Sequence, residues 1–346
     1  MSKITKMFSL MLILVFGVFS LVGCTSGGKE QAGGDKAKES EPVVIKLAHE
    51  NVPKHPMGQA FIKFKELVES RSNGAIKVDL YDSGKFGNAR EIVEGLQTGQ
   101  IQMGSSSTPN LAPFSKDFLI YDLPFLFPDY ESTDKVTDGP IGKKAAAALE
   151  SSNIKGLGYI EIGFRHIFNN AKPVNTMADL KGLKIRSTAS KAHIATLKGL
   201  GANPTPVAWG EVYTALQQKT VDGIDIDLNL AWFNNFQEVN KNLTLVNSIY
   251  SPHLVMINKA FFEKLTPENQ KIVTEAFEEI KVYERKLIRD NEKMIIGKMK
   301  EAGVNVVELT PEERQKWADA TAGVYDEFGG DIGKDLIEQV RETVKK

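Results

Sequence analysis

The stretch LKIRSTASKAHIATLKGLGANPTPVAWGEVYTALQQKTVDGIDI, residues 183–226, decides the fold because strand and helix patterns alternate along it. Its apolar and β-branched runs predict strands over 183–186, 203–207 and 221–226. Apolar residues at helical spacing predict the intervening helices over 189–199 and 211–218. Strands that alternate with helices in this way are typical of a parallel α/β sheet.

The same alternation occurs earlier in the chain. Strand patterns are found at 43–48, 76–81 and 101–103, and helical patterns lie between them at 57–70 and 88–97. About 300 residues follow residue 42, which is enough chain for two lobes rather than one core. Small-molecule sites favour domain interfaces and the carboxyl ends of parallel strands, so we expect a ligand cleft between two α/β lobes.

A long helical pattern begins at Pro267 and reaches about residue 300. Its expected apolar side carries Ile272, Phe277, Ile280, Leu287, Met294 and Ile295. A helix of this length can span both lobes.

The first residues have the pattern of a secretory signal peptide. Lys3 and Lys6 precede an apolar run over 7–22, which is shorter than a membrane-spanning helix needs. The run ends in Leu-Val-Gly-Cys, which resembles the bacterial lipobox, and Cys24 is the only cysteine of the chain. We therefore expect a signal peptide over 1–23, a lipid on Cys24 and a flexible tether over 24–41. The alternatives are an uncleaved membrane anchor and an intermolecular disulfide.

Charge and motifs exclude several classes of protein. The formal net charge of −1 argues against a nucleic-acid partner. The sequence has no HExxH, no G-x-S-x-G, no phosphate loop and no dinucleotide fingerprint, so we expect no catalytic residues, metal or cofactor. The histidines, expected in loops or in the core, are His49, His55, His166, His193 and His253. Asp225 and Asp227 alternate on one strand face, which indicates a solvated strand end in preference to a calcium site.

Two arginines are candidate ligand residues. Arg165 follows an apolar strand where the chain is expected to cross between lobes, and Arg186 ends a strand just before a helix. A guanidinium at a strand end that faces a cleft can bind a carboxylate through two parallel hydrogen bonds. A surface ion pair is the alternative for either residue.

Long motifs resemble the solute receptors of tripartite ATP-independent periplasmic (TRAP) transporters, the DctP family. They include FKELVE at 64–69 followed by Asn73-Gly74, DLPFLF at 122–127, the block from Leu180 to Gly223, and the downstream FQEV at 236–239. The resemblance covers nearly all of the chain from residue 43 to about residue 270.

The resemblance implies a periplasmic-binding-protein-like fold that closes over an organic acid, with no chemistry of its own. It implies a first lobe over 42–163 plus about 251–290, and a second over 164–250 plus about 291–346. Its carboxylate-binding arginines fall on Arg186 and Arg165, and its aromatic contact falls on Trp209. Polar contacts are implied near Glu50, Asn88 and Ser107, where loop capping is an equal alternative. The partner implied is a TRAP membrane permease driven by an ion gradient.

One departure from the family pattern concerns the ligand. Many relatives read Gln-Glu-Asn-Pro after Val-Asp-Gly, but this chain has Ile226 in place of the ligand-binding asparagine. We expect Asp227 or Asn229 to replace that contact, and Asp227 would favour a hydroxyl-rich acid over a dicarboxylate because two carboxylates repel. The remaining alternatives are a receptor for a signalling partner and an anchored extracytoplasmic hydrolase.

Overall fold

The structure is a computed structural model that describes residues 41–345. The predicted signal peptide, the lipid on Cys24 and the tether up to residue 40 lie outside the described residues.

Five strands form the first sheet, in the order β2-β1-β3-β10-β4. They are β1 (Val43–Ala48), β2 (Ile76–Tyr81), β3 (Met103–Ser107), β4 (Ile154–Phe164) and β10 (Tyr250–Asn258). The first three strands pair in parallel, whereas β10 runs antiparallel to both β3 and β4. The sheet is therefore mixed rather than purely parallel, because β10 enters it directly from the second sheet without a helical crossover.

Six strands form the second sheet, in the order β11-β9-β5-β8-β6-β7. They are β5 (His166–Asn169), β6 (Lys184–Ser187), β7 (Asn203–Pro206), β8 (Gly223–Ile226), β9 (Asn242–Leu245) and β11 (Asn305–Glu308). Within it, β8, β6 and β7 are parallel, while β5 is antiparallel to its neighbours. The chain crosses between the sheets at Arg165, between β9 and β10, and after the long helix. The residue ranges of the two lobes stay a prediction.

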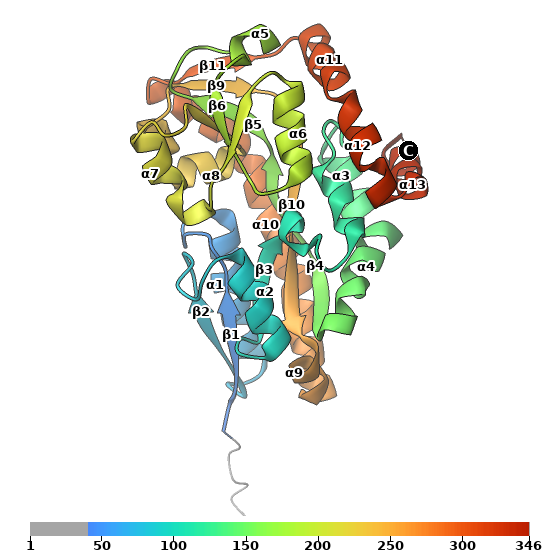
Figure 1. Cartoon of the computed structure of the whole chain (residues 1–346). Helices are drawn as coiled ribbons and strands as arrows, with labels where there is room; N and C mark the ends of the chain where they lie inside the picture. The colour runs from blue at the N-terminus through green and yellow to red at the C-terminus, as the bar shows by residue number, and fades with distance from the viewer. Residues whose placement is uncertain (1–40, 346) are drawn as a thin grey trace, which may run out of the picture. The chain divides into compact units, whose positions relative to one another are not determined.

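Helices cover both sheets (Figure 1). They are α1 (Pro56–Arg71), α2 (Ala89–Thr98), α3 (Tyr130–Thr137), α4 (Pro140–Ala147), α5 (Met177–Leu180), α6 (Lys191–Gly199), α7 (Val212–Gln217), α8 (Leu228–Phe233), α9 (Lys259–Lys264), α10 (Pro267–Glu301), α11 (Pro311–Ala320), α12 (Ala322–Ile332) and α13 (Lys334–Lys345). The predicted start of α2 is explained by Asn88, whose side chain caps the helix in a capping box with Glu91. None of the helices within 41–345 has the length and apolar character needed to cross a membrane.

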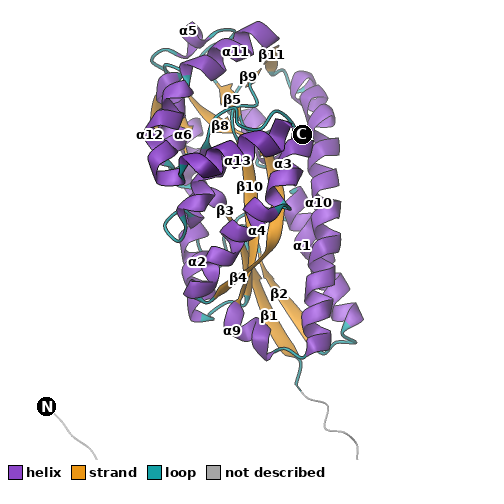
Figure 2. Ribbon diagram, turned by 90° about the vertical axis from the view of Figure 1, so that its right-hand side faces the viewer, coloured by secondary structure: helices purple, strands orange, loops and turns teal. Residues whose placement is uncertain are grey.

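The helix α10 runs alongside both sheets (Figure 2). Its 35 residues correspond to a length of about 50 Å. Thr266 caps it and Pro267 occupies its first turn, so it begins at the predicted residue. Met294 differs from expectation because it is 42% exposed. Consecutive residues point about 100° apart on a helix, so the buried Ile295 beside it takes the place facing the core.

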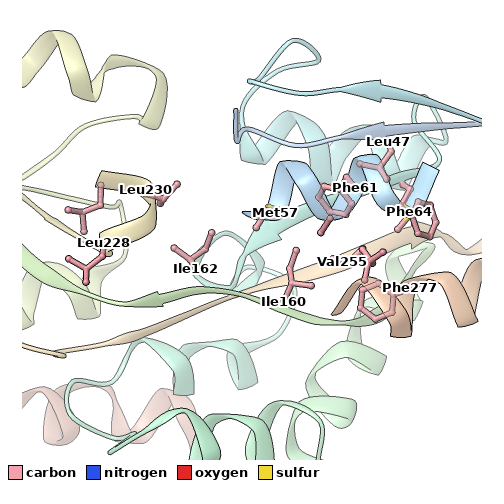
Figure 3. Close-up of a cluster of buried hydrophobic side chains, with 14 of the residues drawn as sticks. Leu47, Met57, Phe61, Phe64, Ile160, Ile162, Leu228, Leu230, Val255 and Phe277 are labelled. Atoms are coloured by element: carbon pink, nitrogen blue, oxygen red, sulfur yellow. The ribbon is translucent and has the colours of Figure 1, made fainter. Parts of the chain in front are cut away.

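The main apolar core continues from the first sheet to α8, at the edge of the second (Figure 3). Phe61 and Phe64 of α1 and Phe277 of α10 pack on the first sheet. Farther along, the same cluster includes Ile162 of β4 and Leu228 of α8. Burial of these side chains fixes β4, α8 and α10 around the point where the chain crosses between the sheets.

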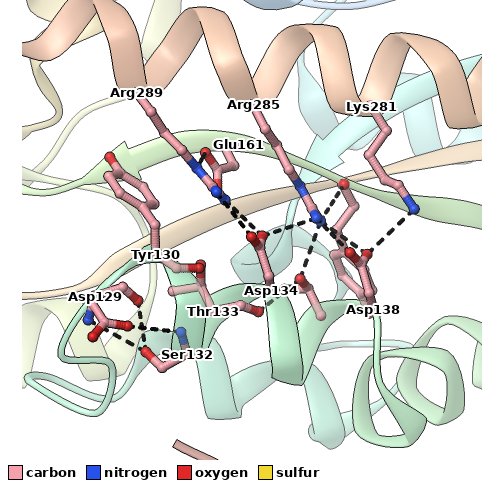
Figure 4. A network of polar contacts seen from close by, with 12 residues as sticks. Asp129, Tyr130, Ser132, Thr133, Asp134, Asp138, Glu161, Lys281, Arg285 and Arg289 are labelled. Atoms are coloured by element: carbon pink, nitrogen blue, oxygen red, sulfur yellow. Dashed lines mark hydrogen bonds and ion pairs between the residues drawn. The ribbon is translucent and has the colours of Figure 1, made fainter.

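An ionic network holds α10 to the first sheet (Figure 4). Arg289 lies 2.6 Å from Glu161 of β4 and 2.7 Å from Asp134 of α3. One turn earlier, Arg285 donates to both carboxylate oxygens of Asp138. Glu161 is fully buried, so its pairing with Arg289 is needed to keep a carboxylate at this position.

Candidate functional site

The two candidate arginines lie close together at the crossover side of the second sheet. Arg186 is in β6, and its Nε and Nη2 donate to the carbonyl oxygen of Val207 at 3.0 and 2.8 Å. Arg165 separates β4 from β5, and its Nε donates to Oδ2 of Asp225 at 2.7 Å. Its Nη2 also bonds the Asp225 carbonyl oxygen. Each arginine is only 5% exposed, so both guanidinium groups are held in a nearly dry environment.

The two guanidinium groups use the same pair of nitrogens for their hydrogen bonds within the protein. In each, Nε and Nη2 are the bonded nitrogens, which leaves the edge formed by Nη1 and Nη2 toward other partners. For Arg165, Nη1 has only a 3.4 Å contact with Ser251 Oγ. For Arg186, none of the residues in 41–345 accepts a hydrogen bond from Nη1. This geometry leaves, on each arginine, a positioned guanidinium edge whose N–H groups can donate to a carboxylate.

The electrostatics of the pair favour an added negative charge. Burial and, to a smaller extent, the neighbouring positive charge of Arg165 lower the pKa of Arg186 to about 9. Asp225 and Glu50 act in the opposite direction, but Asp225 is already paired with Arg165. A ligand carboxylate would supply the counter-charge that Arg186 lacks.

A pocket of about 390 Å³ lies next to Arg186, which reaches it through the lining residue Trp209; neither arginine is itself among the lining residues. Its polar and aromatic lining includes Glu50, Ser83, Asn88, Trp209, Tyr213, Asn234 and Phe236. The guanidinium of Arg186 lies over the Trp209 ring, 5.9 Å from its centroid, and Trp209 in turn contacts Phe236 at 5.8 Å. Trp209 therefore connects the arginine pair to the pocket.

The predicted polar residues of the first lobe separate into two groups. Glu50 and Asn88 line the pocket, and burial raises the pKa of the Glu50 carboxyl against the opposing effects of an Ala89 backbone hydrogen bond and Arg186. Asn88 caps α2 at the same time, so capping and pocket lining are not exclusive. Ser107 is not among the lining residues, and its Oγ accepts a hydrogen bond from Asn110 at 2.8 Å.

The prediction of a solvated strand end at Asp225 and Asp227 is wrong. These residues are 2% and 1% exposed, because β8 lies inside its sheet between β5 and β6. Asp225 pairs with Arg165, and Asp227 caps α8 by accepting a hydrogen bond from the Leu230 amide at 2.8 Å. Neither residue lines the pocket.

Asn229 is bonded to α10 rather than placed along the pocket. Its Nδ2 donates to the Ile288 carbonyl oxygen at 3.2 Å, and its Oδ1 accepts from Asn291 at the same distance. The suggestion that Asp227 or Asn229 replaces the family asparagine therefore stays a prediction, without support from the pocket lining.

Sequence reasoning missed the pocket residues Tyr213, Asn234 and Phe236. Asn234 follows α8 and bonds the Leu230 carbonyl through Nδ2, and the Tyr213 hydroxyl donates to Glu238. Over 211–218 the helical pattern and the family motif gave no indication of which helix face meets the cleft, because that depends on the packing of both sheets.

The histidines are core residues, as predicted, except that His253 is only partly buried. Burial lowers the pKa of His49 to about 4 and that of His55 and His253 to about 3, so these three side chains are neutral at physiological pH. Within 41–345, no group of three or more His, Cys, Asp or Glu side chains is arranged to hold a metal ion.

The sequence over residues 47–331 matches the family of bacterial extracellular solute-binding proteins known as family 7, or DctP. The chain belongs to the DctP family of TRAP-transporter solute receptors. Two α/β sheets joined at several crossovers, with a long helix along both, agree with the predicted two-lobed binding-protein fold.

Relatives of this DctP-family protein bind different acids. The 2,3-diketo-L-gulonate-binding periplasmic protein of Escherichia coli is 41% identical over 81% of this chain and 86% of its own. A sugar acid binding protein from Advenella mimigardefordensis, solved with galactonate, has a TM-score of 0.85 at 32% identity and covers 88% and 98% of the two chains. A TRAP solute-binding protein from Sulfurospirillum deleyianum, solved with succinate, has a TM-score of 0.83 at 30% identity and covers 87% and 99%. The family consists of extracytoplasmic solute-binding proteins, which points away from an enzyme.

Proposed function

We propose that this protein captures a sugar acid, a hydroxyl-rich monocarboxylate, outside the membrane and delivers it unchanged to a TRAP permease. The observation that carries the proposal is the composition of the site. Arg186 and Arg165 are buried together, and among residues 41–345 the Nη1 of Arg186 has no acceptor while that of Arg165 has only the Ser251 hydroxyl. Trp209 connects Arg186 to a pocket whose described lining includes Glu50 and contains no lysine or arginine.

The ligand carboxylate is proposed to bind Arg186 and Arg165. Hydrogen bonds to charged groups contribute about 1.5–3 kcal/mol each, and micromolar affinity needs about 8 kcal/mol in total. The free edges of the arginines can supply a large share of that energy. Their other edges are held by the Val207 carbonyl and by Asp225, so little side-chain freedom is lost on binding.

The remainder of the ligand is proposed to contact Trp209, Glu50, Asn88 and Asn234. A second carboxylate next to Glu50 would meet like charge in a partly dry pocket. A sugar hydroxyl, in contrast, can donate a hydrogen bond to Glu50 or to either amide oxygen. This difference favours a sugar acid over a C4-dicarboxylate.

The test is a titration of the purified protein with galactonate and with succinate by calorimetry. We expect galactonate, or another hexonate in the same series, to bind more tightly than succinate. Glu50→Gln should reduce the difference in affinity between galactonate and succinate. Glu66→Gln, on the exposed side of α1, serves as the matched control. Tight succinate binding without binding of any sugar acid would contradict the proposal. Recovery of a chemically altered ligand would contradict its non-enzymatic part.

The protein is further proposed to be lipid-anchored through Cys24. The support is the lipobox-like sequence and the absence of any other cysteine from the chain. Cys24→Ser should move the protein from the membrane fraction to the soluble extracytoplasmic fraction. Continued membrane association of the variant would argue against the anchor.

A further inference from the structure

Three polar side chains from different elements surround Gly163, next to the crossover at Arg165. The φ angle of Gly163 is +117°, a conformation that side chains with a Cβ rarely adopt. A Cβ at this position would lie 3.3 Å from Tyr130 Oη, 3.6 Å from Asp227 Cβ and 3.6 Å from Glu292 Oε1. Tyr130 belongs to α3, Asp227 caps α8, and Glu292 belongs to α10. The cluster therefore joins elements that pack on both sheets.

Neither of the two carboxyl groups has an ion-pair partner among residues 41–345. Asp227 Oδ1 accepts from the Leu230 amide, but its buried Oδ2 has no hydrogen-bond partner in residues 41–345. Glu292 accepts a hydrogen bond from the neutral Tyr130 hydroxyl.

The arginines near the two carboxyl groups have other partners. Arg165, which faces Asp227 from the crossover, is paired with Asp225. Arg289, near Glu292 on α10, is paired with Asp134 of α3 and with Glu161 of β4. Glu161 adds a further negative charge close to Glu292. Two neighbouring carboxyl groups in such surroundings are costly to ionise together.

Burial is the main cause that raises the pKa of Asp227 to about 7, against the lowering effects of the Leu230 amide and Arg165. Glu292 contributes to this rise by like-charge repulsion. Burial also raises the pKa of Glu292 to about 7; the Tyr130 hydrogen bond and Arg289 lower it, whereas Glu161 raises it. Geometry and charge therefore agree that protonation near neutral pH is favourable at this cluster.

We propose that Asp227 and Glu292 form a proton-binding site at the crossover, and that a proton held there stabilises the arrangement of the two sheets about Gly163. When both carboxyl groups are ionised, their repulsion acts between α8 and α10, which pack against each other and on β4, while α10 also packs on β11 of the second sheet. The site makes the stability of the protein sensitive to pH at a place that does not line the ligand pocket.

The sign of the effect follows from proton linkage. Both groups bind a proton more tightly in the folded chain than in the unfolded chain, because each pKa is raised by folding. Their contribution to stability is therefore lost as the pH rises from about 4 to about 7, and it changes little above that range.

The test compares melting temperatures of ligand-free wild type, Asp227→Asn and Glu292→Gln between about pH 5 and about pH 8. Asparagine can still cap α8, and glutamine can still accept from Tyr130, so both variants keep the local hydrogen bonds. Asp290→Asn, which removes an exposed carboxylate from the same helix, is the matched control. We expect each test variant to match wild type near pH 5 and to melt several degrees higher near pH 8.

The proposal would be overturned if the melting temperatures of the test variants differed from that of wild type by the same amount at every pH. It would also be overturned if Asp290→Asn showed the same pH-dependent difference from wild type. If Asp227→Asn fails to fold, Glu292→Gln alone decides the outcome by the same comparison. The series is repeated with sodium replaced by choline. A difference that follows sodium concentration rather than pH would show a cation site and would also overturn the proposal. No ligand is used, so the result is separate from the test of sugar acid binding.

Discussion

Two pairs of arginines in this molecule have opposite surroundings. Arg285 and Arg289 on α10 contact an excess of carboxylates, from Asp134, Asp138 and Glu161. Arg165 is paired with a single carboxylate, Asp225, whereas Arg186 has no ion-pair partner among residues 41–345 and donates only to a backbone carbonyl. The positive charges of Arg285 and Arg289 are thus fully compensated by carboxylates, whereas the combined charge of Arg165 and Arg186 is not.

The pKa values follow this difference. Hydrogen bonds and attraction to carboxylates outweigh burial at Arg285 and Arg289 and raise the pKa of both. At Arg186 burial dominates, and the pKa is lowered to about 9. The compensated arginines hold elements of the fold together, and we propose that Arg186, whose charge is unmatched, binds an anion from outside. Mutations in the two pairs should therefore affect different measurements.

The largest effect is expected from Arg289→Ala. The change removes the ion-pair partner of the fully buried Glu161 and leaves its carboxylate with the neutral Tyr250 hydroxyl as its side-chain hydrogen-bond donor in residues 41–345. We expect the free energy of unfolding to fall by about 3 kcal/mol. Urea denaturation of the ligand-free protein measures the loss.

The control for this change is Arg90→Ala, because Arg90 forms an ion pair with Glu94 on the surface of α2 with 86% of its side chain exposed. Its loss should change the free energy of unfolding far less than the loss of Arg289, because solvent screens an exposed ion pair. Equal stability losses in the two variants would remove the distinction between buried and exposed arginine pairs.

The second effect concerns Arg186→Ala, which should change binding rather than stability. The loss of two charged hydrogen bonds to the ligand carboxylate corresponds to about 3 kcal/mol, or an affinity about 100-fold weaker. Stability should be maintained without ligand, because folding buries this charge unfavourably. Calorimetric titration measures the loss of affinity, and urea denaturation of the same preparation measures the stability.

Arg186→Lys separates charge from geometry at the same position. Lysine keeps the positive charge but not the planar fork, so its affinity should lie between those of alanine and arginine. Unchanged affinity in both variants would remove Arg186 from the site.

The fold was largely predictable from the sequence because its elements carry their own start and stop signals. Asn88 before α2 and Pro267 at the start of α10 lie where the structure places them, since caps and prolines act within one helical turn. The antiparallel insertion of β10 was not predictable. A buried strand has the same apolar pattern whichever direction it runs, and direction is set by which sheet the chain comes from.

The site was predictable only in part. Arg165 and Arg186 were predicted as ligand residues from strand ends and family motifs; the structure places them near each other, with Arg186 next to the pocket residue Trp209, and their binding role stays a prediction. The burial of Asp225 was missed, because local spacing does not show that an arginine distant in the sequence pairs with it. The roles of Tyr213 and Asn234 depend in the same way on how the two sheets face each other, which no local pattern records.

The smallest effect is expected from Trp209→Leu. The indole lies below the Arg186 guanidinium at 5.9 Å, and cation–π contacts of this kind contribute about 0.5–2 kcal/mol. Leucine keeps an apolar side chain but removes the aromatic face, so ligand affinity should fall about 5-fold. Trp209→Phe, which retains an aromatic face, should lose less.

Trp232→Leu is the matched control, because Trp232 of α8 also lies near a cation, Lys298 at 5.7 Å, but does not line the pocket. Its loss should leave affinity unchanged. If the two tryptophan variants weaken binding equally, the effect comes from packing of the second sheet rather than from the orientation of Arg186. Suppose that Trp209→Leu weakens ligand binding, that Trp232→Leu does not, and that Trp209→Leu has no further effect on affinity in the Arg186→Ala background. The aromatic ring then acts through the guanidinium, because interacting residues are non-additive in a double-mutant cycle. That outcome would show that the unmatched arginine is held in orientation by a neutral surface, whereas those of α10 are held by opposite charge.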